Sequence, residues 1–193
     1  MPPEIGRRLV HASGAFVPGL YLLDQHVLQS GIVTWRLVQA LAVGGLIVTA
    51  ILEAARLYAG FDHVIYQRLT REYEQEKVAG YALYVLSSTI VVLVFDPQIA
   101  VPALLMLMLG DPVSGILAGD ELRLIKRPRV LVGMFVVCLA LAYPFVSPLA
   151  AILGALGAMV ADGVKLTVGD YIVDDNLTIP ILSAVVMRAV LAV

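Results

Sequence analysis

The chain is poor in charge and in cysteine for its length. Only 15% of its 193 residues are charged, whereas a soluble domain typically has about 25%. The one cysteine, Cys138, lies inside an apolar run, which excludes an intrachain disulfide and favours a packed hydrophobic side chain. The sequence also lacks a Gly-x-x-x-x-Gly-Lys loop and a kinase-type glycine-rich loop, so two common nucleotide-binding motifs are excluded.

Apolar residues are abundant instead. They make up 60% of the chain, compared with about 45–50% in soluble domains, and the mean hydropathy is +0.91. Because a soluble domain of this size cannot bury so much apolar surface, the composition predicts an all-α integral membrane protein. We expect one polytopic domain over residues 1–193. Runs of sufficient length predict about seven transmembrane helices, over 9–28, 34–57, 80–95, 97–118, 130–146, 148–164 and 177–192.

The first and sixth predicted spans need separate consideration. Arg7 and Arg8 precede an apolar stretch that has no small-residue cleavage site, so we interpret it as a retained span and not as a cleavable signal peptide. The sixth span is short, rich in alanine and glycine, and follows Pro144 and Pro148. A re-entrant hairpin is an alternative there. Its small residues, such as Gly154 and Gly157, suit close contact between helices.

The basic residues predict the orientation in the membrane. Of the 13 lysines and arginines, all but Arg36 and Arg188 fall at the N-terminus, at the end of the second span, or in the loops after the second, fourth and sixth spans. Lysine and arginine favour the cytoplasmic side of a membrane. We therefore expect a multi-pass protein of the cell membrane whose longer polar loops, and whose active site, face the cytoplasm.

Polar residues gather at these cytoplasmic ends. They are His11 in the first span, Gly110-Asp111 before Pro112, Asp162 after the sixth span, and the run 174–176, Asp-Asp-Asn, before the seventh. Ionisable groups at a bilayer margin are costly and indicate function. Carboxylate and amide oxygens suit Mg²⁺, and nearby lysines and arginines suit phosphate. Together these groups favour phosphoryl transfer to an apolar acceptor.

Each of these groups also has a structural interpretation. Arg7 and Arg8 suit topological anchoring, and Gly110-Asp111 suits a turn that ends a helix. The basic loop with Lys126, Arg127 and Arg129 suits binding of anionic lipid head groups. The run 174–176 suits a helix N-cap, although one cap needs only one of its two adjacent carboxylates. We favour function for that run.

Four motifs run along the whole chain. They are Arg-Arg-Leu-Val-His at 7–11 with Gly14, Arg-Glu-Tyr-Glu at 71–74, Leu-Gly-Asp-Pro at 109–112, and Asp-Asp-Asn-Leu-Thr-Ile-Pro at 174–180. In order, spacing and number of spans, the chain resembles the dolichol kinase / phytol kinase family of CTP-dependent polyprenol kinases, and most closely its archaeal members. The motif at 174–180 is the most specific of the four.

The resemblance implies CTP as the phosphoryl donor, a long-chain isoprenoid alcohol as the acceptor, and Mg²⁺ or another divalent cation. The product would be dolichyl or polyprenyl phosphate, the lipid carrier in glycosylation, and we expect no nucleic-acid partner. The candidate catalytic residues are Asp111, Asp175 and His11, and the candidate metal ligands are Asp111, Asp162, Asp174 and Asp175. The candidate nucleotide- or phosphate-binding residues are Arg8, Gly110, Lys126, Arg127, Arg129, Lys165 and Asn176.

The sequence departs from the family pattern at two points. Many members carry a Lys-Ser/Thr-x-Glu-Gly stretch after the Gly-Asp motif, but residues 126–133 contain no glutamate. The family glutamate before the final motif is here Asp162. A phytol or geranylgeraniol kinase and a CTP-dependent cytidylyltransferase that makes a CDP-lipid remain alternatives. A small transporter or membrane scaffold is a third, which the nearly charge-free middles of the spans disfavour.

Overall fold

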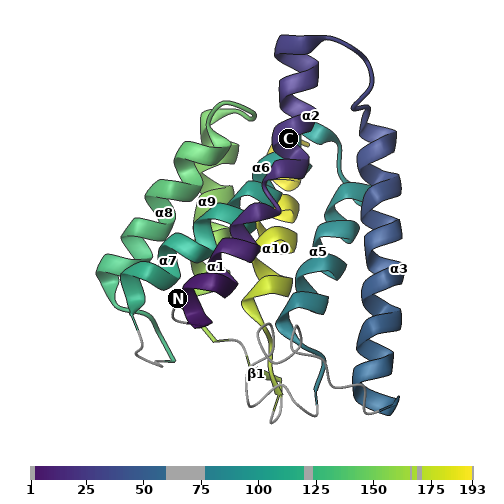
Figure 1. Cartoon of the computed structure of the whole chain (residues 1–193). Helices are drawn as coiled ribbons and strands as arrows, with labels where there is room; N and C mark the ends of the chain where they lie inside the picture. The colour runs from purple at the N-terminus through teal and green to yellow at the C-terminus, as the bar shows by residue number, and fades with distance from the viewer. Residues whose placement is uncertain (1–2, 60–76, 120–123, 166, 169–170, 193) are drawn as a thin grey trace.

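A computed structural model describes residues 3–59, 77–119, 124–165, 167–168 and 171–192. The motif at 71–74, together with Arg68 and Arg123, lies outside the described residues. The described chain is almost entirely helical and folds into a bundle (Figure 1). Its α-helices are α1 Pro3–Ser13, α2 Phe16–Leu23, α3 Trp35–Ala59, α5 Gly80–Val94, α6 Pro97–Leu105, α7 Asp111–Ala118, α8 Pro128–Ala142, α9 Pro148–Gly163 and α10 Asp175–Leu191.

Most predicted spans correspond to observed helices, because prolines and apolar runs mark them clearly. Pro97, Pro128 and Pro148 each stand at the start of a helix, where the missing N–H costs nothing. The sixth predicted span forms α9 as one uninterrupted helix, so the alternative of a re-entrant hairpin is wrong. The fourth runs without interruption through α6, the π-helical turn η3 (Met106–Gly110) and α7.

The unbroken helix expected over 9–28 is wrong. A turn at Gly14 and Ala15 separates α1 from α2, and α2 continues into the π-helical turn η1 (Asp24–Leu28). A Cβ atom at Gly14 would lie 1.8 Å from the hydroxyl of Tyr84, so the turn packs closely against α5. Helix α1 is amphipathic and begins before the apolar run, which explains why a hydropathy window misplaced its start.

The all-α class is confirmed, but the polar stretch after α9 contains a small feature that the sequence did not predict. It contains two short antiparallel strands, β1 Thr167–Val168 and β2 Tyr171–Ile172, in which Thr167 pairs with Ile172 and Val168 with Tyr171. The sequence analysis predicted only helices. Hairpins this short carry almost no periodic signal, so the pattern could not have shown it.

The core lies where α6, α9 and α10 meet. Its largest fully buried side chains include Leu104, Met106, Met134, Ile179 and Met187. Small residues on α9 let α10 approach closely: a Cβ atom at Gly154 would lie 2.5 Å from Cγ of Met187. The close helix contact predicted for this alanine- and glycine-rich segment is therefore present.

Two helical segments of the described chain are long and apolar enough to cross a membrane, namely Trp35–Ala59 and Pro97–Ala118. Their surroundings differ. The second is 67% buried within its most apolar stretch and forms part of the core, whereas α3 is only 11% buried there. Helices α5, α8 and α9 are apolar but have 15 or 16 residues, which is shorter than the roughly 20 residues that a typical span needs.

A buried carboxylate fixes α3 to the start of α5. Glu53 accepts hydrogen bonds from Arg56, at 2.6 Å and 3.0 Å, and from the backbone N–H of Ala79 at 2.8 Å. The hydroxyl of Tyr81 also donates to Glu53. The guanidinium of Arg56 donates further to the carbonyl of Lys77. Because α3 has few other buried side chains, this cluster determines where its C-terminal end lies.

Candidate active site

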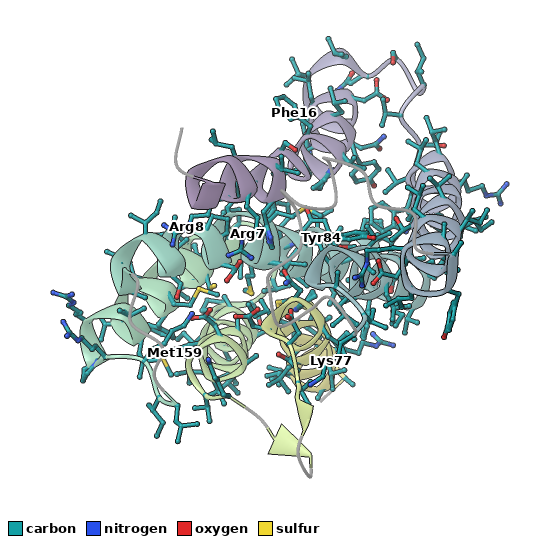
Figure 2. All side chains as sticks on the ribbon, turned by 60° about the horizontal axis from the view of Figure 1, so that its bottom comes forward. Arg7, Arg8, Phe16, Lys77, Tyr84 and Met159 are labelled. Atoms are coloured by element: carbon teal, nitrogen blue, oxygen red, sulfur yellow. The ribbon has the colours of Figure 1, made fainter. Side chains whose placement is uncertain are left out.

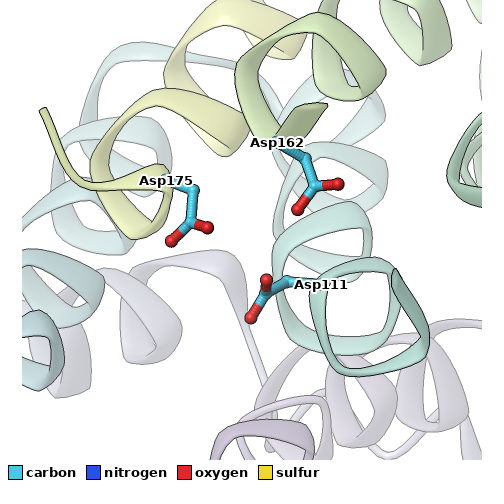
Figure 3. A group of neighbouring side chains, drawn as sticks. All are labelled: Asp111, Asp162 and Asp175. Atoms are coloured by element: carbon cyan, nitrogen blue, oxygen red, sulfur yellow. The ribbon is translucent and has the colours of Figure 1, made fainter. Parts of the chain in front are cut away.

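Three aspartates converge at one end of the bundle. Asp111 begins α7, Asp162 lies in the last turn of α9, and Asp175 begins α10. One carboxylate oxygen of each lies within 4.8 Å of the others, and Figure 3 shows the three side chains pointing toward one another. Asp162 is buried and the other two are half-buried. Close carboxylates repel one another strongly at low solvent exposure, so this arrangement favours a nearby cation.

The π-helical turn before Asp111 leaves a carbonyl available. In a π pattern the carbonyl of Leu107 would accept from the N–H of residue 112, but residue 112 is proline and has no N–H. His11 Nε2 instead lies 3.0 Å from this carbonyl oxygen. The local sequence of the turn therefore creates the anchor point for α1.

His11 consequently has a definite hydrogen-bonding role. A carbonyl oxygen can only accept, so Nε2 carries the hydrogen and donates it to Leu107. The carboxylate of Asp111 is 3.7 Å from the same nitrogen. The imidazole also packs edge-to-face on Tyr84, with ring centroids 4.6 Å apart, and the Tyr84 hydroxyl donates to the His11 carbonyl at 3.1 Å. Through these contacts His11 fixes α1 to η3 and α5, next to the carboxylates.

Asp174 accepts hydrogen bonds from Asn176, whereas Oδ1 of Asn176 is buried and has no hydrogen-bond partner in the described part of the chain. One oxygen of Asp174 accepts from the backbone N–H of Asn176 at 2.9 Å and from its side-chain amide at 2.7 Å. Asp174 is thus the N-cap of α10, and its carboxylate stays outside the group of three. The backbone carbonyl of Asn176 accepts a hydrogen bond from the hydroxyl of Ser87 on α5 at 2.6 Å. Of the two adjacent aspartates, the structure brings only Asp175 to the cluster.

Lys126 supplies positive charge to the cluster. Its ammonium lies 2.6 Å from one oxygen of Asp162 and 3.1 Å from the hydroxyl of Ser114, which donates to the other oxygen of Asp162 at 2.6 Å. Ser114 is completely buried. The sequence analysis missed Ser114, although it lies three residues after Asp111, where a helix places side chains on one face.

The other basic residues predicted to bind phosphate, and Arg7, differ in where they lie and in how exposed they are. Arg7 and Arg8 extend from α1 toward the bundle (Figure 2), and the guanidinium of Arg8 packs over Gly115, where a Cβ atom would lie 3.3 Å from Nε. Arg127 is half-buried, whereas Arg129 and Lys165 are exposed. The cluster therefore has Lys126 in direct contact and other cations at a greater distance.

Gly110 does not face the carboxylates. A Cβ atom there would lie 3.1 Å from the sulfur of Cys138 and 3.2 Å from Met134. Glycine at this position lets α8 pack against the π-helical turn, and Cys138 is buried in the same contact. Gly110 therefore has a packing role beside Asp111, and its role in nucleotide binding stays a prediction.

The donor set fits a divalent cation. Two oxygen ligands of one Mg²⁺ ion lie at most about 4.2 Å apart, twice the usual metal–oxygen distance of about 2.1 Å. The three carboxylate oxygens are separated by no more than 4.8 Å, so a small inward movement would place them around one ion. All three carboxylates offer hard oxygen donors, which Mg²⁺ and Mn²⁺ prefer.

Comparisons of the chain with known protein families, with curated proteins and with solved structures find no match. The arrangement of the residues must therefore carry the functional interpretation.

Proposed function

We propose that this protein is a CTP-dependent lipid kinase, which transfers the γ-phosphoryl group of CTP to the hydroxyl of a long-chain isoprenoid alcohol. One observation carries the proposal: three aspartates from distant parts of the sequence meet beside Lys126 at one end of a strongly apolar bundle. Acidic groups, a divalent cation and basic side chains are what phosphoryl transfer requires. The sequence resemblance supplies the nucleotide and the class of acceptor.

The chain's own residues have distinct tasks in this reaction. Asp111 and Asp175, with Asp162 beside them, would hold Mg²⁺, which would neutralise charge on the phosphates. Lys126 would add a positive charge at the same place. The alcohol oxygen bonds to the γ-phosphorus, the bond to the β–γ bridging oxygen breaks, and CDP leaves. A carboxylate of the cluster would accept the alcohol proton, because these oxygens lie where the metal ion and the phosphates would be bound.

We further propose that the protein spans the cell membrane several times. Helix α3 supports this, because it is apolar, long enough to cross, and largely uncovered by the rest of the chain. Large side chains along it, such as Leu41, Ile47 and Ile51, are more than half exposed. The carboxylate cluster lies at the end where the N-terminal arginines and Lys126 gather, which is the cytoplasmic end by the positive-inside rule.

Two differently labelled forms of CTP test the reaction. Purified protein is incubated with Mg²⁺, a panel of dolichol, phytol and geranylgeraniol, and CTP labelled at either the γ- or the α-phosphorus. The proposal expects γ-label in the lipid product and α-label only in CDP. Transfer of α-label to a lipid phosphate acceptor, added to the same panel, would indicate the cytidylyltransferase instead. Absence of γ-transfer to every alcohol would contradict the kinase proposal.

A further inference from the structure

Asp162 differs from the other two aspartates in its hydrogen bonding. Both of its oxygens are already engaged: Oδ1 accepts from Lys126 at 2.6 Å and Oδ2 from Ser114 at 2.6 Å. The side chain of Asp162 has no solvent exposure. In contrast, within the described residues no hydrogen bond occupies the carboxylate of Asp111 or Asp175. Nε2 of His11 lies 3.7 Å from Oδ2 of Asp111, which is too long for a hydrogen bond.

The backbone holds Lys126 in this position. Ile125 and Val164 form an antiparallel bridge, in which the N–H of Lys126 donates to the carbonyl of Gly163 at 3.0 Å and the N–H of Lys165 donates to Leu124 at 3.1 Å. The segment before α8 is thereby paired with the segment after α9. Because Asp162 directly precedes this pairing, Lys126 and Asp162 are brought together by main-chain contacts as well as by charge.

Lys126 retains one donor for a ligand. An ammonium group has three N–H donors, and two of them are directed to Ser114 and Asp162. The side chain is 20% exposed, although both partners are buried. The third N–H is therefore the one that can reach a group outside the protein, and the tetrahedral geometry of the ammonium fixes its direction.

We propose that the three aspartates have two separate tasks, an inference that rests on the proposed function and deepens it. Asp111 and Asp175 hold the divalent cation. Asp162 and Ser114 are positioning residues that fix Lys126, and the free N–H of Lys126 binds a phosphate oxygen of the nucleotide. Asp162 is therefore not a metal ligand in this scheme, even though its oxygen lies within 4.8 Å of the other two.

The cost of the alternative supports this division. For Asp162 to bind a metal ion directly, it would have to share an oxygen that already accepts a hydrogen bond from Lys126 or Ser114, and the Lys126 ammonium, 2.6 Å from Oδ1, would repel a divalent cation there. A movement that broke either contact would leave a buried charge or a buried hydroxyl without its partner, and both losses are unfavourable. Within the described residues, Asp111 and Asp175 have no comparable hydrogen bonds.

Binding of Mn²⁺ alone, followed by electron paramagnetic resonance, tests the first part. Loss of a direct ligand should weaken binding more than the roughly 10–100-fold that loss of an outer partner causes. We expect more than about 100-fold weaker binding for D111N and D175N, but less than about 100-fold for D162N. Lys126→Met should bind Mn²⁺ as well as or better than the unaltered protein, because a positive neighbour is removed and Asp162 is released.

Binding of inorganic pyrophosphate to the Mn²⁺-loaded protein, measured by calorimetry, tests the second part. A hydrogen bond to a charged group is worth about 1.5–3 kcal/mol, so K126M should weaken pyrophosphate binding by about 10-fold or more. Ser114→Ala should weaken it by about 3-fold, since Lys126 keeps its bond to Asp162 but loses one positioning contact. Lys126→Arg should recover part of the affinity, because it restores the positive charge.

Two variants serve as matched controls. Ser183→Ala removes another completely buried serine, whose hydroxyl bonds only within α10 to the carbonyl of Pro180. Arg188→Met removes an exposed cation at the other end of α10. Neither should change the binding of Mn²⁺ or of pyrophosphate. These controls separate an effect on Lys126 from a general loss of packing or of charge.

The outcomes distinguish this inference from the proposed function. If D162N weakens Mn²⁺ binding as much as D111N does, or if K126M leaves pyrophosphate binding unchanged, the division of tasks is wrong even where γ-transfer occurs. If γ-transfer fails but the expected pattern of Mn²⁺ and pyrophosphate binding is found, the inference stands and the reaction is a different one. Neither measurement requires turnover.

Discussion

Asp174 and Asp175 are adjacent in the sequence, but their side chains have different roles in the structure. Asp174 caps α10 through Asn176, whereas Asp175 points to the carboxylate cluster. The sequence pattern placed both among the metal ligands, because a carboxylate at a helix start suits a cap and a metal equally well. Side-chain direction at the first residues of a helix is what decides between these roles, and spacing alone does not give it.

We predict opposite results for the two conservative substitutions at this site. Asp175→Asn should abolish turnover while the folded protein remains, because the amide removes a charge from the cluster. Asp174→Asn should retain most of the activity, since asparagine caps helices as well as aspartate does. Steady-state γ-transfer assays and the unfolding temperature of each variant measure both effects. Equal activity of the two variants would contradict the assignment of Asp175.

The sequence indicated a role for His11 but did not indicate its hydrogen bond, and it indicated no role for Ser114. His11 stood out as an ionisable group one turn into an apolar segment, and the structure places it beside Asp111. Its donation to the Leu107 carbonyl depends on a π-helical turn, which hydropathy does not reveal. Ser114 looked like an ordinary helical residue, and only its contact with Asp162 distinguishes it.

At the scale of elements, the junction between α1 and α2 depends on one close contact. The Tyr84 hydroxyl donates to the His11 carbonyl and occupies the space where a side chain at Gly14 would begin. Tyr84 therefore holds the junction from α5. The docking of α1, and with it the position of His11 and Arg8, depends on a glycine at residue 14.

We predict that Gly14→Ala destabilises the protein and that Tyr84→Phe partly reverses the effect. The added methyl group would overlap the Tyr84 hydroxyl, and overpacking typically costs about 1–3 kcal/mol. Removing that hydroxyl makes room, although Tyr84→Phe alone should cost about 0.5–1.5 kcal/mol for the lost hydrogen bond. Unfolding of the two single variants and of the double variant, in detergent, gives the coupling energy. Simple additivity of the two losses would show that the contact is unimportant.

The sequence predicted most helices but not the break in the first. Apolar runs bounded by proline located α6, α8 and α9 to within two residues at their starts, because proline at a helix start is a local signal. The turn at Gly14 is different, since it is set by Tyr84, seventy residues further along the chain. A short window of the sequence does not include both residues of such a contact, so it cannot predict the contact.

At the scale of the whole molecule, the arrangement of helix ends is the feature that the membrane proposal uses. The end of α3, the start of α5, the end of α9 and the start of α10 lie together at the lower end in Figure 1. Arg36, near the start of α3, lies at the opposite end of that 25-residue helix. Asp162, in the last turn of α9, and Asp175, at the start of α10, place the carboxylate cluster at this end of the bundle.

We predict that the two ends are accessible from opposite sides of the membrane. In a Cys138→Ala background, cysteine introduced by K165C should react with an impermeant maleimide only from the cytoplasmic side, and cysteine introduced by R36C only from the outer side. Both positions are exposed on the protein, so the membrane alone would limit their reaction. Labelling in right-side-out and inverted vesicles measures this. Reaction of both from the same side would contradict a membrane-spanning α3.

The overall plan of the molecule was more predictable than its site. Composition alone indicated helices in an apolar environment, and the positions of the lysines and arginines grouped the polar segments at one end. The convergence of Asp111, Asp162 and Asp175 was expected from that grouping. Which oxygens remain available for a ligand was not, because it depends on individual hydrogen bonds from Lys126 and Ser114.

Proline at position 112 has a consequence beyond the geometry of its own helix. The hydrogen that this imino acid withholds is what leaves the Leu107 oxygen for the imidazole of His11. Any other amino acid at residue 112 would add a backbone N–H that can compete with the imidazole for this oxygen. A proline in the middle of the chain thus supports the docking of α1, together with the contacts that Tyr84 makes to His11.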